Sequence, residues 1–219
     1  MRYSLSNPTE EFRPVTDPHR ISTVAELRER MGEAGKTTPM KVWKGLEGPA
    51  RDYIAASPFL LLATSDAAGN VDVSPKGDGP GFVAVEDDRT LLIPDRRGNK
   101  LLFGMQNILE NPHVGVIFIR PGTEETFRVN GRAELTADPA ILARLEQRGQ
   151  PAVLAIRVAI DECFFHCAKA FKRARLWEPE SWPEEARVSW GALMAPKLGG
   201  DAAMAARIDA AIEEDARNL

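Results

Sequence analysis

The residues best suited to chemistry lie between Leu91 and Lys100, in the segment LLIPDRRGNK. Three apolar residues that favour a strand lead into three cations, a glycine and an amide, and a helix is predicted directly afterwards, over about 101–109. At such a junction backbone N–H groups and the helix dipole point toward an anion. Arginine and lysine add charge and further donors. The segment therefore favours a phosphate site, and the alternative is a solvated turn with ordinary surface charges.

A second group of reactive residues consists of Cys163 and Cys167, with His166 between them. This spacing suggests a metal site, but a structural zinc ion normally needs four protein ligands. The other two histidines, His19 and His113, lie far away in the sequence. We therefore interpret the cysteines as two small, buried, reduced thiols.

Composition limits the class of protein. The chain has 219 residues, of which 43% are hydrophobic and 27% charged, as expected for a soluble globular protein. Its net charge of -4 argues against nonspecific nucleic-acid binding, which needs a basic surface. No apolar run approaches the roughly 20 residues that span a bilayer, and residues 1–8 lack the apolar core of a signal peptide. We expect a cytoplasmic protein without nucleic-acid or membrane partners.

Helices are predicted near both ends of the chain. Residues 1–20 are polar and proline-containing, which indicates an extended arm. Thr23 and Glu26 have the spacing of a capping box and predict a helix over about 24–32. A second helix is predicted over 48–56 and another over about 139–147. The alanine-rich tail from Asp201 has a thin apolar stripe, which predicts an amphipathic helix that covers a core edge or binds a partner.

Short apolar or alternating segments separated by turns predict a mainly β fold with peripheral helices. Six or more such strands suggest a small closed barrel. The predicted strands are 59–64, 71–74, 82–85, 90–93, 113–119, 126–133 and about 152–166.

Five segments, in this order and spacing, carry a family resemblance. They are SPKGDGPGFV (Ser74–Val83), IPDRRGNK (Ile93–Lys100), NILENPHVGVIF (Asn107–Phe118), FRVNGRA (Phe127–Ala133) and FFHCAKAFKRARLW (Phe164–Trp177). Together they resemble the pyridoxamine 5'-phosphate oxidase-like flavoproteins, and within these an uncharacterised bacterial branch. The resemblance implies a six-stranded antiparallel split β-barrel of the FMN-binding type over residues 46–183. An N-terminal arm (1–45) and a C-terminal helical extension (184–219) would flank it.

The resemblance also implies a phosphate site. In the family, basic residues of the strand-to-helix turn hold the FMN phosphate, and this chain offers Arg96 or Arg97, with Asn99 and Lys100. The oxidases usually carry an Arg-Lys pair where this chain has Asn99 and Lys100, so the choice between the two arginines stays open.

The flavin ring has its own set of implied contacts. The resemblance places the backbone of Val73 and Ser74 beside the ring and Lys76 near its edge or the substrate. Thr126 stands where the oxidases commonly place a glutamine that contacts the ring. The alternative for Lys76 is an exposed loop lysine.

In these homodimers each FMN also contacts the partner subunit. The resemblance assigns this contact to His166, Lys169, Arg173 and Trp177, with Trp177 packing on the flavin. From the residues alone, His166 is equally consistent with a core histidine, Trp177 with a core side chain and Arg173 with a solvated face.

The function implied is that of an FMN-dependent oxidoreductase with an unknown small-molecule substrate. Pyridoxamine phosphate oxidation is not favoured, because the oxidases place an Arg and a His together near the C-terminus and Arg175-Leu176-Trp177 is not followed by a histidine. Two alternatives remain. One is a non-catalytic flavin or haem binder, with His166 as a possible axial ligand, and the other is a reductase that uses the deazaflavin F420.

Overall fold

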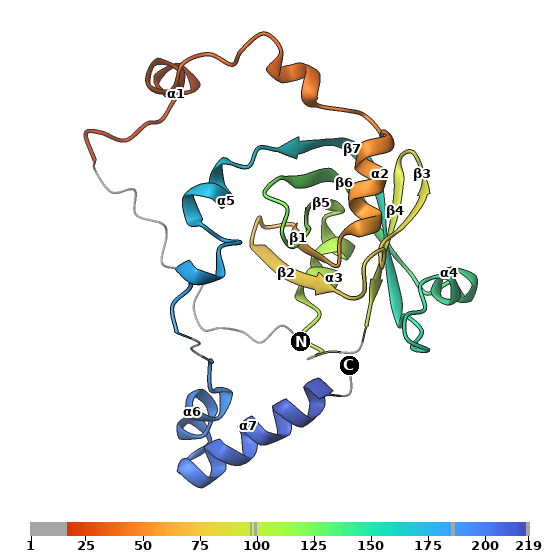
Figure 1. Cartoon of the computed structure of the whole chain (residues 1–219), viewed down its shortest axis with the longest axis vertical. Helices are drawn as coiled ribbons and strands as arrows, with labels where there is room; N and C mark the ends of the chain where they lie inside the picture. The colour runs from red at the N-terminus through yellow and green to blue at the C-terminus, as the bar shows by residue number, and fades with distance from the viewer. Residues whose placement is uncertain (1–16, 97, 99, 185–186, 218–219) are drawn as a thin grey trace. The chain divides into compact units, whose positions relative to one another are not determined.

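The computed structural model describes residues 17–96, 98, 100–184 and 187–217 (Figure 1). The chain divides into two compact units. The first unit comprises the chain up to Arg120 together with Thr126–His166, and the second comprises Pro121–Glu125 and the chain from Cys167 onward. Each unit is described by itself.

The first unit is built on one antiparallel sheet of seven strands (Figure 1). Its order is β2-β1-β5-β6-β7-β4-β3. The strands are β1 (Phe59–Ser65), β2 (Val71–Gly77), β3 (Ala84–Asp87), β4 (Thr90–Asp95), β5 (His113–Ile119), β6 (Thr126–Thr136) and β7 (Leu154–His166).

The six strands implied by the family resemblance are one too few, because the short β3, close to the predicted strand 82–85, is a seventh member of the sheet. It pairs with β4 across a tight turn in which Asp87 accepts hydrogen bonds from the Arg89 N–H and the Thr90 hydroxyl. Among the described residues the backbone pairing does not join the edge strands β2 and β3. An ion pair between Lys76 and Asp95 links β2 to β4 instead, which shows that the sheet curls far enough to bring β2 close to the end of β4.

The core of the first unit follows from the alternation of apolar residues along the strands. In β1 and β5 every second side chain is buried, which is the pattern expected for a sheet with one packed face. Helix α2 (Gly48–Ala56) adds Ala50, Tyr53 and Ile54 to the same cluster. The largest fully buried side chains are Phe118, Phe127, Ile54, Leu60, Leu62, Leu91, Leu92, Ile93, Ile156 and Ile160.

Several predicted helices are confirmed. Helix α1 (Val24–Met31) has the expected capping box between Thr23 and Glu26, and α2 has the predicted bounds. Helix α3 begins later than expected, and α4 ends earlier. The remaining helical elements are α3 (Phe103–Glu110), α4 (Pro139–Arg144), α5 (Lys169–Ala174), α6 (Trp190–Met194), α7 (Ala202–Arg217) and the 3-10 turns η1 (Thr38–Lys41), η2 (Pro179–Ser181) and η3 (Pro196–Leu198).

In the second unit the predicted C-terminal helix is α7, which packs against α6. The Asp209 carboxylate accepts hydrogen bonds from the Ser189 hydroxyl (2.5 Å) and the Gly191 N–H (2.7 Å). These bonds lower the pKa of Asp209. Gly191 is required at the crossing, because a Cβ there would collide with the carbonyl of Ala205. Among the described residues, no helix combines the length and apolar character needed to span a bilayer.

We predict that Gly131→Ala destabilises the first unit. Gly131 lies at an irregularity in the β6–β7 pairing, where a Cβ would collide with the backbone carbonyl of Ala159. Such overpacking typically costs about 1–3 kcal/mol of the free energy of unfolding. Urea denaturation measures the loss. Gly115→Ala is the control, since a Cβ there would lie 3.5 Å from its nearest neighbour, Asn130 Oδ1. Equal stability of the two variants would contradict the prediction.

Candidate functional site

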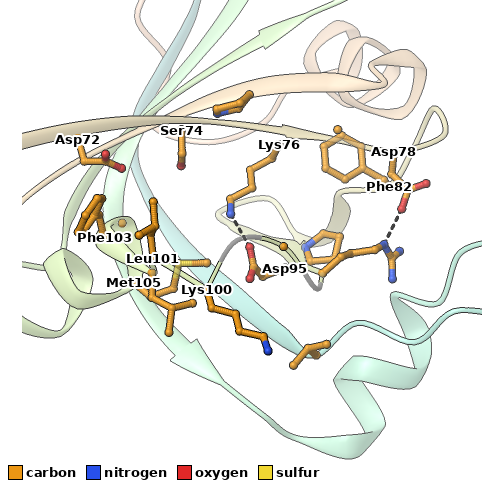
Figure 2. A pocket seen from close by; sticks show the side chains of 18 residues that line it. Asp72, Ser74, Lys76, Asp78, Phe82, Asp95, Lys100, Leu101, Phe103 and Met105 are labelled. Atoms are coloured by element: carbon orange, nitrogen blue, oxygen red, sulfur yellow. Dashed lines mark hydrogen bonds and ion pairs between the residues drawn. The ribbon is translucent and has the colours of Figure 1, made fainter. Parts of the chain in front are cut away.

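An open cleft of about 750 Å³ lies in the first unit (Figure 2). One wall is β2 with the adjoining Asp78, and the other consists of the described residues between Pro94, near the end of β4, and Met105, in the first turn of α3. Phe82 and Val153 complete the lining. The cleft therefore contains the strand-to-helix segment in which the sequence predicts a phosphate site.

The alternation of β2 decides which of its side chains face the cleft. Asp72, Ser74 and Lys76 are partly buried and line it, whereas Val73 is 58% exposed. Figure 2 shows the side chains of Asp72, Ser74 and Lys76 extending from β2 into the cleft, with Lys76 directed at Asp95. The structure thus brings the predicted residues Ser74 and Lys76 together with the basic turn. Val73 pairs with Ala63 of β1 and does not line the cleft.

Lys76 is anchored by an ion pair with Asp95, as the dashed line in Figure 2 shows. The two side chains are only 15% and 14% exposed. Lys76 is therefore a partly buried part of the cleft wall and not a freely exposed loop lysine.

Arg96 has internal partners for all three guanidinium nitrogens. Its Nε donates to Asp78 Oδ2 (2.6 Å), and its terminal nitrogens donate to the carbonyl oxygens of Leu145 and Gln150 (2.9 Å each). The planar fork of arginine suits such multiple bonding. Arg96 therefore fixes the turn against its surroundings, and it leaves little donor capacity for a ligand. The alternative arginine, Arg97, lies outside the described residues, as does Asn99.

The chain between β4 and α3 has an unusual backbone. Lys100 and Leu102 have positive φ angles of 60° and 57°, a conformation that costs non-glycine residues about 1–2 kcal/mol each. Such strain is typical of functional sites. Lys100 lines the cleft, is exposed, and forms no ion pair with any described residue. It is therefore the described cation most available to an anion in the cleft.

An acid that the sequence analysis did not select lies beside the start of α3. A Cβ added to Gly104 would lie 3.6 Å from Asp72 Oδ2 and 3.8 Å from the Ser74 hydroxyl. The Asp72 carboxylate thus complements the positive end of the α3 dipole and disfavours a second anion there. The period of two that Asp72 shares with Ser74 and Lys76 could have revealed it.

Two other predicted residues lie elsewhere in the first unit and do not line the cleft. Thr126 is 6% exposed and pairs with His166 across β6 and β7. The pKa of His166 is lowered by burial and by the positive charge of Arg128. Arg128 itself lies over the ring of Phe164, 4.2 Å from its centroid. His166 is therefore a partly buried imidazole whose neutral form is favoured.

The last three predicted residues, Lys169, Arg173 and Trp177, belong to the second unit. Trp177 donates its ring N–H to the carbonyl oxygen of Thr123 (2.9 Å) and packs near Phe171. Their predicted contact with a partner subunit's flavin remains a prediction.

The two cysteines differ in environment. Cys163 is fully buried, and burial, reinforced by the charges of Glu47 and Glu162, raises the pKa of its thiol to about 11. Cys167 is exposed, so the expectation of two buried thiols was wrong. It follows His166, the last residue of β7, where the ladder that buries Cys163 has ended. Within the described residues, three or more metal-binding side chains do not cluster.

The structure is thus a mainly β fold with an open cleft of about 750 Å³ between β2 and the start of α3. The sequence pattern of the family described as "Pyridoxamine 5'-phosphate oxidase" matches residues 46–167. This chain belongs to that family. Comparison with curated proteins finds no significant match.

Solved structures of similar proteins have low sequence identity. HupZ of Group A Streptococcus is 18% identical and covers 55% of this chain and 93% of its own, with a TM-score of 0.45. HutZ, the heme storage protein of Vibrio cholerae, is 19% identical, with 54% and 93% covered and a TM-score of 0.40. An FAD binding protein of Mycobacterium smegmatis is 19% identical, with 57% and 97% covered and a TM-score of 0.38.

We predict that a maleimide reagent labels one thiol of the native protein rapidly. Cys167 is exposed, whereas Cys163 is buried and its thiolate is disfavoured. Mass spectrometry should show one adduct per chain at neutral pH and two after unfolding in urea. Cys167→Ser should abolish the rapid adduct, and rapid labelling of Cys163 in that variant would contradict the account.

Proposed function

We propose that this chain is an FMN-binding flavoprotein, and that it acts as an FMN-dependent oxidoreductase on a small-molecule substrate. The observation that carries the proposal is the cleft, where Lys100, which forms no ion pair with another described residue, adjoins a partly apolar wall. The family assignment supports the same conclusion, because the cleft contains the strand-to-helix turn that holds a phosphate in related oxidases.

The residues of the cleft fit the two parts of FMN. Its volume of about 750 Å³ is within the usual range of small-molecule sites. Leu101, Phe103 and Met105 give one wall an apolar surface for a flavin ring, and the Ser74 hydroxyl offers a hydrogen bond from β2. The dianionic tail needs cations and N–H donors, which the segment after β4 supplies.

The distribution of charge in the cleft favours one position for the phosphate. The Asp72 carboxylate lies beside the start of α3, and Arg96 is engaged by internal acceptors. Lys100 remains available, and we include Arg97 and Asn99 of the same turn in the phosphate site. The phosphate would then bind at the turn, ahead of the first residue of α3.

Bound FMN would supply hydride transfer at its N5 atom. The residues of this chain would bind and orient it. Lys100 would bind the phosphate, Ser74 would form a hydrogen bond with a polar edge of the ring, and the apolar wall would exclude water. We further propose that Thr126 contacts the flavin ring, and that the protein is a homodimer in which each flavin also contacts residues of the partner subunit. The proposed partner contacts are those at positions 166, 169, 173 and 177.

A second candidate function is haem binding through His166. The lowered pKa of His166 favours the neutral imidazole, which is the form that binds metals. A Soret band that His166→Ala abolishes would support this function, and flavin absorbance without a Soret band would support the first.

We predict that the double variant Arg97→Ala, Lys100→Ala binds FMN more weakly and riboflavin equally well. Each hydrogen bond to a charged group contributes about 1.5–3 kcal/mol, so the loss of two should raise the Kd for FMN at least about a hundredfold. Riboflavin lacks the phosphate and so does not probe these two residues. Flavin fluorescence titration of apoprotein measures both affinities, and F420 can be compared in the same assay.

The control for this experiment is Arg30→Ala, Lys36→Ala, which removes two exposed cations from residues outside the cleft. It should leave both affinities unchanged. An unchanged Kd for FMN in the cleft variant would show that the phosphate binds elsewhere. Absence of any flavin binding by the parent protein would overturn the proposed function.

A further inference from the structure

Two ion pairs of opposite polarity cross the cleft wall. Lys76 of β2 pairs with Asp95 of β4, and Asp78, just after β2, pairs with Arg96, just after β4. All four residues line the cleft (Figure 2). Side chains of the first pair are 15% and 14% exposed, and those of the second are 26% and 11% exposed. Partly buried charges such as these are screened less by solvent and salt than exposed ones, so they act more strongly on a ligand bound in the cleft.

The two pairs differ in how firmly the cation is held. Arg96 has two carbonyl acceptors besides Asp78, so its charge is fixed by three bonds from different parts of the chain. Lys76 has Asp95 as its partner among the described residues. The ammonium group of a lysine lies on a flexible side chain and can turn toward another anion. Unlike Arg96, Lys76 need not break a hydrogen bond to a backbone carbonyl when it does so. Lys76 is therefore the cation of the wall that can respond to a change of charge in the cleft.

We infer that Asp95 is a positioning residue, which holds Lys76 in the cleft wall and partly neutralises it, so that the pair tunes how strongly the site stabilises reduced flavin. The inference rests on the proposed function. Reduced flavin carries negative charge on its ring, and a nearby cation stabilises it. Asp95 opposes that effect, because its carboxylate repels the same charge and competes for the Lys76 ammonium. The balance of the two side chains sets the preference of the cleft for oxidised or reduced FMN.

Substitutions of Lys76 and of Asp95 should therefore shift the reduction potential of bound FMN in opposite directions. Asp95→Asn removes the negative charge, leaves Lys76 uncompensated, and should favour reduced FMN. Lys76→Gln leaves Asp95 uncompensated and should favour oxidised FMN. The double variant Lys76→Gln, Asp95→Asn replaces the ion pair with a neutral pair of similar shape. Its bound FMN should have a reduction potential close to that of the parent protein.

The experiment measures the reduction potential of FMN bound to the parent and the three variants, together with the Kd for oxidised FMN. Each single variant should change the ratio of affinities for reduced and oxidised FMN about tenfold, which corresponds to about 30 mV for a two-electron couple. If one single variant fails to fold, two results still test the inference: the direction in which the other single variant shifts the reduction potential, and the reduction potential of the double variant.

Asp78→Asn is the matched control, because it also removes one carboxylate from the wall but leaves the carbonyl bonds of Arg96 in place. It should shift the potential less than Asp95→Asn. Equal shifts in these two variants, or no shift in either member of the Lys76–Asp95 pair, would overturn the inference while flavin binding persists. Loss of all flavin binding by the parent protein would instead overturn the proposed function.

Discussion

The first unit depends on bringing the two ends of one curled sheet together. Backbone pairing among the described residues does not link β2 to β3, and side chains of β2 and of the chain around the end of β4 make the connection instead. Their ion pairs are partly buried, so that loss of one partner would leave a poorly solvated charge. This constraint forms the cleft, since it holds the basic turn opposite the inner face of β2.

Much of the fold could be predicted from local sequence. The capping box at Thr23 fixes the start of α1, and alternation of apolar residues identifies the strands of the sheet. The start of α3 could not be predicted in this way. Lys100 and Leu102 adopt left-handed backbone conformations, which delay the helix to Phe103, and neither residue type signals that conformation.

The site was predictable in part. The composition of the turn pointed to Lys100, the family resemblance implied Ser74 and Lys76, and all three residues line the cleft. The partners that give these residues their roles come from distant positions. Arg96 is held by carbonyl groups of residues 145 and 150, which carry no side-chain signal at all. Ion-pair partners such as Asp95 depend on how far the sheet curls, and a period of two in one strand contains no information about that curvature.

We propose above all that the turn after β4 binds the phosphate of FMN. A crystal structure of the protein with saturating FMN is the decisive experiment. We expect a phosphate oxygen within hydrogen-bonding distance of Lys100 Nζ and a flavin ring between β2 and the start of α3. FMN bound at another site, with Lys100 turned into solvent, would contradict the claim.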